Sequence, residues 1–185
     1  MSGQLLVEHC SPTLAGIKTG NLFKVSISEG EDLTGEIREF NRAFAKKGLR
    51  IVPVKKTGDY YLIYVYRPQY LVRDLNNPDA RSILSRKGYE LKGSKYILAQ
   101  LVKHLSKDAD FPHEIGLFLG YPPADVLGFM NDPRKGVMCT GSWKAYSNPE
   151  EARKTFSRYS KCRDVYKRLY KNGRTLDQLT VNTER

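Results

Sequence analysis

The sequence predicts an α+β fold in which a small, mainly antiparallel sheet is packed by helices. Two neighbouring segments, residues 49–55 and 60–66, are rich in β-branched and aromatic side chains, and the KTGD sequence between them suits a hairpin turn. Other segments repeat apolar residues at helical spacing, and the last of these is long and basic. A chain of 185 residues has the usual size of one domain, so we expect residues 1–185 to form a single domain.

Caps and periodicity predict the first elements. Ser11 is a favourable N-cap and Pro12 suits the first helical position, so a short helix is expected to begin here and to end between residues 16 and 20. A brief strand is expected over residues 22–27. Apolar residues at helical spacing predict a clearer helix over residues 31–47, which a glycine ends.

The remaining elements are mostly helical. Three helices are expected in the middle of the chain, at residues 68–75, 78–87 and 94–106. The apolar run EIGLFLGY at residues 114–121 lies between two prolines and is predicted to be a buried strand, although runs of this kind also form helices. A helix over residues 123–130 and a strand over residues 137–146 follow. Asn148 is expected to cap a long helix over residues 149–171.

Cysteine usage and charge restrict the class of protein. Three cysteines without a CxxC pair indicate neither a disulfide framework nor a structural zinc site, and no apolar run approaches the ~20 residues that span a bilayer. The chain contains neither a GxxxxGK[ST] nor a GxGxxG motif, so the sequence does not predict nucleotide binding by these loops. We therefore expect a cytoplasmic protein without a membrane partner, a metal or a cofactor. Its 31 Lys and Arg residues outnumber its 20 Asp and Glu residues, and the formal charge of +11 attracts polyanions.

The basic residues concentrate in the predicted C-terminal helix. Because its opposite face is apolar, this helix carries a cationic stripe that would attract an anionic partner such as nucleic acid or an acidic protein. The residues expected to bind the anion are Arg153, Arg158, Lys161, Lys167 and Arg168. The same long side chains are also suited to solvating an outer face of the protein. No RNP, KH or zinc-finger motif predicts specific readout of a nucleic acid.

Several segments resemble those of a known family. They are HCSPTLAGIK from His9, YVYRP from Tyr64, FPHEIGLFLGYP from Phe111, DVLGF from Asp125, CTGSW from Cys139 and KCRDVYKRLYKNGRTLDQLT from Lys161. The most specific motifs are PHE, at Pro112, His113 and Glu114, and LGYP, at Leu119, Gly120, Tyr121 and Pro122. From about residue 5 to residue 181 the chain resembles domain-of-unknown-function family 3793. That bacterial family has no assigned activity, so the resemblance implies no particular chemistry.

The most specific chemical hypothesis is a cysteine nucleophile. The predicted helix start would put Cys10 at a helix N-terminus, where unpaired N–H groups and the dipole stabilise a thiolate. His113 is the candidate base, Asp132 or Asn131 would orient its imidazole, and Gln4 would help to bind an oxyanion. This order loosely resembles that of papain-like enzymes, although no CGSCW sequence surrounds the cysteine. A thiol-dependent hydrolase or transferase is therefore the leading interpretation.

Other interpretations of these residues stay open. A free cysteine such as Cys10 often packs as a small apolar residue, and His113 also suits a structural role beside a strand. His9, Cys10, His113 and Glu114 offer ligands for a metal in an iron-linked or redox-linked accessory protein, although no HExxH or CxxC spacing supports this. The third interpretation is a non-catalytic adaptor that binds its anionic partner through the C-terminal helix.

Overall fold

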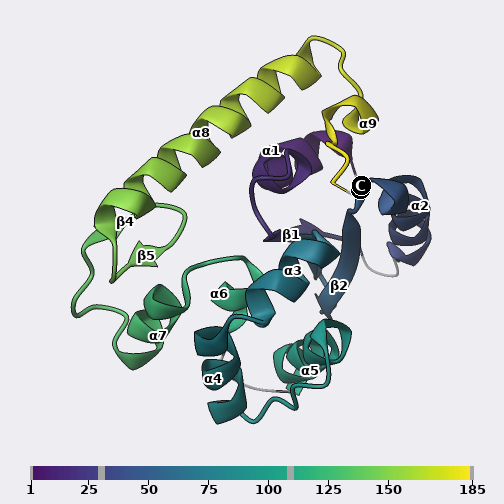
Figure 1. Ribbon diagram of the computed structural model, residues 1–185. Helices are drawn as coiled ribbons and strands as arrows, with labels where there is room; N and C mark the ends of the chain where they lie inside the picture. The colour runs from purple at the N-terminus through teal and green to yellow at the C-terminus, as the bar shows by residue number, and fades with distance from the viewer. Residues whose placement is uncertain (1, 29–31, 108–110, 184–185) are drawn as a thin grey trace.

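The computed structural model describes residues 2–28, 32–107 and 111–183, and it has the α+β fold that the sequence predicts (Figure 1). Its helices are α1 (Gly3–Leu14), α2 (Thr34–Phe44), the 3-10 helix η1 (Ala45–Lys47), α3 (Pro68–Leu75), α4 (Pro78–Arg86), α5 (Ser94–Lys107), α6 (Ile115–Phe118), α7 (Pro123–Asn131), α8 (Pro149–Lys171) and α9 (Leu176–Leu179). Its strands are β1 (Gly20–Ser26), β2 (Arg50–Lys56), β3 (Tyr60–Tyr66), β4 (Cys139–Thr140) and β5 (Lys144–Ala145). Residue 31, where the second helix is predicted to begin, lies outside the described residues.

The main sheet has three antiparallel strands in the order β1-β3-β2. The pairing of β2 with β3 confirms the predicted hairpin, and Ile51 lies opposite Val65 in it. On the other side of β3, Phe23 of β1 lies opposite Ile63. Such β-branched and aromatic residues fit a pleated sheet with both faces covered.

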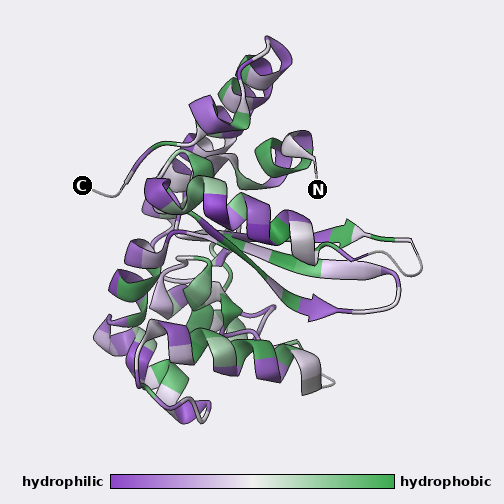
Figure 2. Ribbon diagram, turned by 90° about the vertical axis from the view of Figure 1, so that its right-hand side faces the viewer, coloured by the Kyte–Doolittle hydropathy of each residue, from purple (hydrophilic) through white to green (hydrophobic). Residues whose placement is uncertain are grey.

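The sheet separates two hydrophobic cores, because successive side chains of a strand point to opposite faces. Leu62 and Tyr64 of β3 belong to the core formed with α3, α4, α5, α6 and α7. Ile63 and Val65 belong to the core formed with α1, α2 and α9. Figure 2 shows the strands across the middle of the molecule, with helices above and below them. Helices therefore cover both faces of the sheet.

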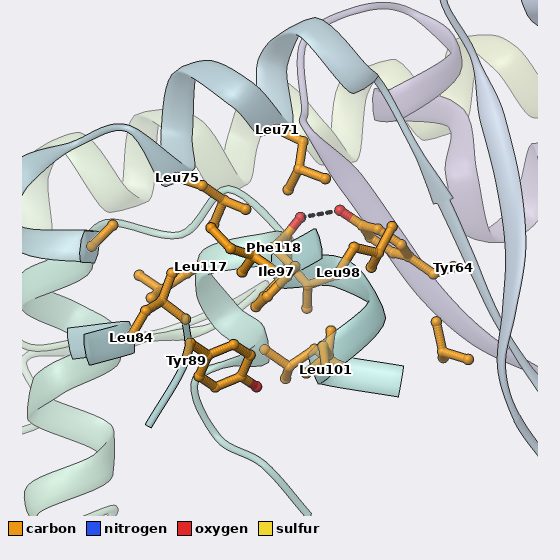
Figure 3. Packing of buried hydrophobic residues seen from close by; sticks show 14 of the residues in the cluster. Tyr64, Leu71, Leu75, Leu84, Tyr89, Ile97, Leu98, Leu101, Leu117 and Phe118 are labelled. Carbon is orange, nitrogen blue, oxygen red and sulfur yellow. Dashed lines mark hydrogen bonds between the residues drawn. The ribbon is translucent and has the colours of Figure 1, made fainter. Parts of the chain in front are cut away.

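Tyr64 joins the sheet to α6. Its ring is buried beside Leu71 and Phe118, and its hydroxyl donates a hydrogen bond to the Phe118 carbonyl (Figure 3). This carbonyl belongs to the last residue of a helix, where no further turn supplies an N–H donor. Burial raises the pKa of Tyr64, so its hydroxyl keeps the proton that it donates.

The first helix begins earlier than the sequence predicts. α1 starts at Gly3, and the Ser2 side chain caps it. Ser11 and Pro12 lie near its end, and the Ser11 hydroxyl donates to the Val7 carbonyl of the same helix. The predicted start at Ser11 is therefore wrong, because packing of α1 on the sheet outweighs a local cap signal. The apolar residues buried along this helix are Leu6, Val7, Cys10 and Leu14.

Two of the predicted strands are also wrong. Residues 114–121 contain the helix α6, because an apolar run without a clear period fits a buried helix as well as a strand. Gly120, with a φ of 76°, follows this helix and ends it. Residues 137–146 contain two short strands, β4 and β5, rather than one. The chain turns at Gly141, where the Phe156 ring packs in the space that a Cβ would occupy.

The long C-terminal helix is confirmed. α8 spans Pro149–Lys171, and the Asn148 side chain accepts the Glu151 N–H as the predicted N-cap. Figure 1 shows this helix along one side of the molecule, crossing from β4 to α9. Within the described residues, none of the helices has both the length and the hydropathy of a membrane span.

Candidate functional site

A cleft of about 490 Å³ opens between segments that are far apart in the sequence. The loop at residues 16–19, helix α3, the turn before α7 and the N-terminal half of α8 form its walls. The charged residues that line it are Lys18, Arg73, Asp125, Glu151 and Arg158, and the aromatic ones are Tyr70, Trp143 and Tyr159. Cavities of this size that combine aromatic walls with a few polar groups are typical of small-molecule sites.

Lys18 is a buried cation that faces this cleft. The residue is only 6 % exposed, and its side chain has no hydrogen bond or ion pair to any described residue. Its Nζ lies 5.3 Å from the ring centroid of Tyr121 and 6.0 Å from that of Tyr159. Burial lowers the pKa of Lys18 to about 8. Aromatic faces compensate only part of the cost of burying a charge, and no described residue supplies the counter-ion that buried cations usually have.

Two arginines stand at the edge of the cleft. Arg73 on α3 is held by the adjacent Asp74, with 2.8 Å between its Nε and Oδ1. Arg158 on α8 lies with its guanidinium carbon 5.9 Å from the centroid of the Tyr159 ring. All five basic residues that the sequence predicts to bind an anion are exposed along α8, and of these Arg158 lines the cleft.

Asp125 holds one wall of the cleft in place. Its carboxylate accepts hydrogen bonds from the backbone N–H groups of Tyr146 and Ser147, from the Ser147 hydroxyl and from the Trp143 indole, at 2.7 to 2.9 Å. These bonds connect α7 to Trp143, just before β5, and to Tyr146 and Ser147, just after it. Because the carboxylate is buried and fully engaged, Asp125 has a structural role in the wall.

The LGYP motif forms part of the same wall. The Tyr121 ring stacks on Trp143 with 5.0 Å between ring centroids, and its hydroxyl donates to the Ser142 carbonyl. Pro122 precedes the first residue of α7, and Leu119 is buried in the core. Gly120 lies against Thr19, whose hydroxyl donates to Asp74. The motif therefore positions the loop that carries Lys18.

We expect Gly120→Ala to destabilise the protein by roughly 2–4 kcal/mol. The residue has a positive φ, and an added Cβ would lie 2.7 Å from the Thr19 Oγ1. Gly88→Ala is the matched control, because Gly88 also has a positive φ but has free space around it. Urea denaturation of both variants separates backbone strain from the collision with Thr19. Equal losses of stability would contradict the predicted contact.

Cys10 does not lie at a helix N-terminus. It lies in the second half of α1, it is 0 % exposed, and apolar residues of the sheet and α2 share its core. Burial raises the pKa of its thiol, and the nearby Lys18 offsets only part of this effect. The thiol is therefore protonated and enclosed, which favours the interpretation of Cys10 as a core residue over that of a nucleophile.

The other residues of the catalytic hypothesis lie in different parts of the molecule. His113 packs edge-on against Phe129 in an apolar pocket, and Gln4 lines a separate hollow beside α8. Asn131 ends α7, and the Asp132 carboxylate accepts the backbone N–H groups of Arg134 and Lys135, which lower its pKa. Among the described residues, no hydrogen bond, ion pair or ring contact joins any two of these predicted side chains.

The PHE motif is an anchor for α6. The Pro112 carbonyl accepts the Ile115 N–H where this helix begins, and the buried Glu114 accepts the Tyr89 hydroxyl at 3.0 Å. Glu114 also lies 3.8 Å from the Nδ1 of His104. As for the metal interpretation, His9 stacks on Phe23, and the described part of the chain contains no group of three or more ligand side chains suited to a metal ion.

No signal in the sequence marks Lys18 as a functional residue. Its neighbours in sequence, Ile17 and Thr19, form no known motif with it, and its burial depends on Tyr121 and Tyr159, which lie more than a hundred positions further along the chain. A lysine in a short loop normally predicts solvent exposure. Only the folded arrangement identifies this residue.

Comparisons with known proteins give a family without an activity. Neither the curated proteins nor the solved structures include a match to this chain. The family model described as "Protein of unknown function (DUF3793)" matches residues 6–180. This match covers nearly the whole length, including the cleft, the PHE and LGYP motifs and α8, and the chain therefore belongs to that family.

Proposed function

We propose that this protein binds a small anionic molecule in the cleft, with Lys18 contacting the anionic group. The observation that carries the proposal is a lysine that is almost fully buried, faces a cavity and has no carboxylate partner in the described parts of the chain. A buried ammonium is unfavourable without a counter-ion, and an anionic ligand would supply one. The anionic group of the ligand would therefore act as the counter-ion of Lys18.

The rest of the cleft fits such a ligand. Arg158 and the Asp74-paired Arg73 stand at the edge. Of the two acids in the lining, Asp125 already accepts four hydrogen bonds from the protein, and Glu151 is exposed in the first turn of α8. Trp143 and Tyr159 offer aromatic surface for the body of the ligand. A phosphate or a carboxylate group suits this combination, because both accept hydrogen bonds from ammonium and guanidinium groups.

This proposal is tested by titrating the full chain with sulfate and monitoring its NMR chemical shifts. We expect Lys18→Met to weaken sulfate binding at least roughly tenfold, which corresponds to about 1.4 kcal/mol. The same variant should be no less stable than the wild type without sulfate, because it replaces an unpaired buried charge with an apolar side chain of similar length. This opposite response of affinity and stability distinguishes a ligand contact from a structural role.

Lys161→Met is the matched control, because Lys161 is exposed on α8 and is not part of the cleft lining. It should leave sulfate affinity unchanged. If it weakens binding as much as Lys18→Met does, the anion binds to the exposed basic stripe of α8 that the sequence predicts, and the cleft proposal fails.

Sulfate affinity should also decrease as the pH rises through about 8, where Lys18 loses its proton. Sulfate keeps its own charge in this range, so the change reports the protein. Below this pH the buried charge destabilises the ligand-free fold in full. Above it the folded chain releases the proton before the unfolded chain does, so stability rises with pH. A Lys18→Arg variant that still binds sulfate should lack this pH dependence, because arginine stays charged.

A further inference from the structure

We infer that Lys18 is a nucleophilic amine that captures the carbonyl group of its anionic ligand as a reversible imine. This inference rests on the proposed function and adds the class of ligand, a small aldehyde or ketone that carries a phosphate or carboxylate group. The arrangement that supports it is a buried amine at the wall of an open cleft, with cationic groups at the edge.

The amine is available for attack. A lysine held by a carboxylate keeps its proton, but among the described residues Lys18 contacts the ring faces of Tyr121 and Tyr159 and has no hydrogen bond or ion pair to an acid. With its pKa lowered to about 8, it is neutral in roughly a tenth of the molecules at pH 7, against well under a hundredth for an exposed lysine. Desolvation of this kind is one way in which proteins activate a lysine toward carbonyl compounds.

The second requirement is a means to hold the carbonyl compound beside the amine. Arg73 and Arg158 line the same cavity as Lys18, so in a carbonyl ligand they would retain the anionic group while Lys18, no longer paired with that group, contacts the carbonyl carbon. Such retention converts a slow encounter of amine and carbonyl into a reaction within one complex. A carbonyl compound without an anionic group should therefore react much more slowly.

The chemical step is balanced without a further reactant. The Lys18 nitrogen attacks the carbonyl carbon and forms a carbinolamine, while one proton moves from the nitrogen to the oxygen. The carbon–oxygen bond then breaks, and the oxygen leaves as water with the second proton of the amine. The product is a carbon–nitrogen double bond between the ligand and Lys18. Nothing is oxidised or reduced, and addition of water reverses the step.

Reductive trapping tests the inference on the full chain. The protein is incubated with pyridoxal 5′-phosphate, glyoxylate or pyridoxal, and sodium borohydride then converts any imine to a stable secondary amine for mass spectrometry of the peptides. We expect one adduct per chain, on Lys18, at least roughly tenfold faster than on Lys161. The two anionic aldehydes distinguish a phosphate preference from a carboxylate preference. Pyridoxal should react at least roughly tenfold more slowly than its phosphate.

Any of four results would overturn the inference. Adducts spread evenly over the exposed lysines would indicate ordinary surface chemistry. Equal rates with pyridoxal and pyridoxal 5′-phosphate would exclude guidance by an anionic group. If sulfate binds and depends on Lys18 but no adduct forms there, the imine is excluded while the proposed anion binding stands. Failure of sulfate binding and of trapping together would remove both proposals.

Arg158→Gln, which leaves Lys18 in place, should slow the trapping of the phosphate compound.

Discussion

Arg67→Met is expected to lower the free energy of unfolding by about 3–5 kcal/mol, the largest effect that we predict for a single substitution. Arg67 is 0 % exposed. Its guanidinium donates to the carbonyls of Thr13 and Leu14 at the end of α1, to the Lys47 carbonyl at the end of η1 and to the Thr183 hydroxyl. Each of these carbonyls keeps one backbone N–H donor, from Gly16, Val181 or Thr183, but removing the guanidinium breaks the buried network that joins α1, η1 and the C-terminal segment. Each lost hydrogen bond to the charged group costs about 1.5–3 kcal/mol.

Urea denaturation of the Arg67→Met variant measures this loss. Arg86→Met is the control, because Arg86 is an exposed arginine at the end of α4 and should change stability very little. Arg67→Lys should also be strongly destabilising, since an ammonium does not reproduce the planar set of guanidinium donors. A loss below about 1 kcal/mol in Arg67→Met would contradict the role that we assign to the guanidinium.

The second large effect is expected for Asp125→Ala, with a loss of about 3 kcal/mol and a disturbed cleft. The substitution removes the acceptor for the Trp143 indole and for the backbone N–H groups of Tyr146 and Ser147. Trp143 is the only tryptophan of the chain, so its fluorescence reports on this wall directly. We expect a red-shifted emission in the native variant, together with weaker binding of sulfate.

Asp132→Ala is the control for this experiment. The Asp132 carboxylate also accepts two backbone N–H groups, but the residue is exposed and lies in the turn after α7. It should leave the tryptophan emission where it is in the wild type. An Asp125→Ala variant with unchanged emission and unchanged sulfate affinity would show that the wall does not depend on this carboxylate.

Local sequence signals predict much of the fold because the bounds of several elements are determined by residues within them or next to them. Strand β3 and helix α8 have the predicted bounds, since the β-branched and aromatic run of one and the Asn-Pro start of the other are visible within a few residues. The signal at Ser11 and Pro12 is equally local, yet it is wrong because α1 gains more from burial against the sheet. Local patterns fail where tertiary packing determines the ends of an element.

The candidate site is predicted far less well than the fold. Arg158 is among the residues that the sequence proposes for anion binding, and it lines the cleft. Lys18 is missed, because its burial arises from contacts with residues of α8 and of the turn before α7. Cys10 is proposed as a nucleophile because of its residue type, although the fold buries it completely. The sequence specifies the chemistry of each side chain, but the desolvation of that side chain and its access to solvent depend on the fold.

The packing of α1 against α8 and α9 has a consequence for synthesis of the chain. One face of the sheet is covered by the first helix, which itself depends on the last helices and on Leu179 for its apolar surroundings. A nascent chain on the ribosome therefore has this apolar surface exposed until α8 and α9 have been synthesised. The opposite core, built from β3 and the helices that follow it, becomes complete sooner. During translation the two sides of the molecule thus differ in their exposure to chaperones and proteases.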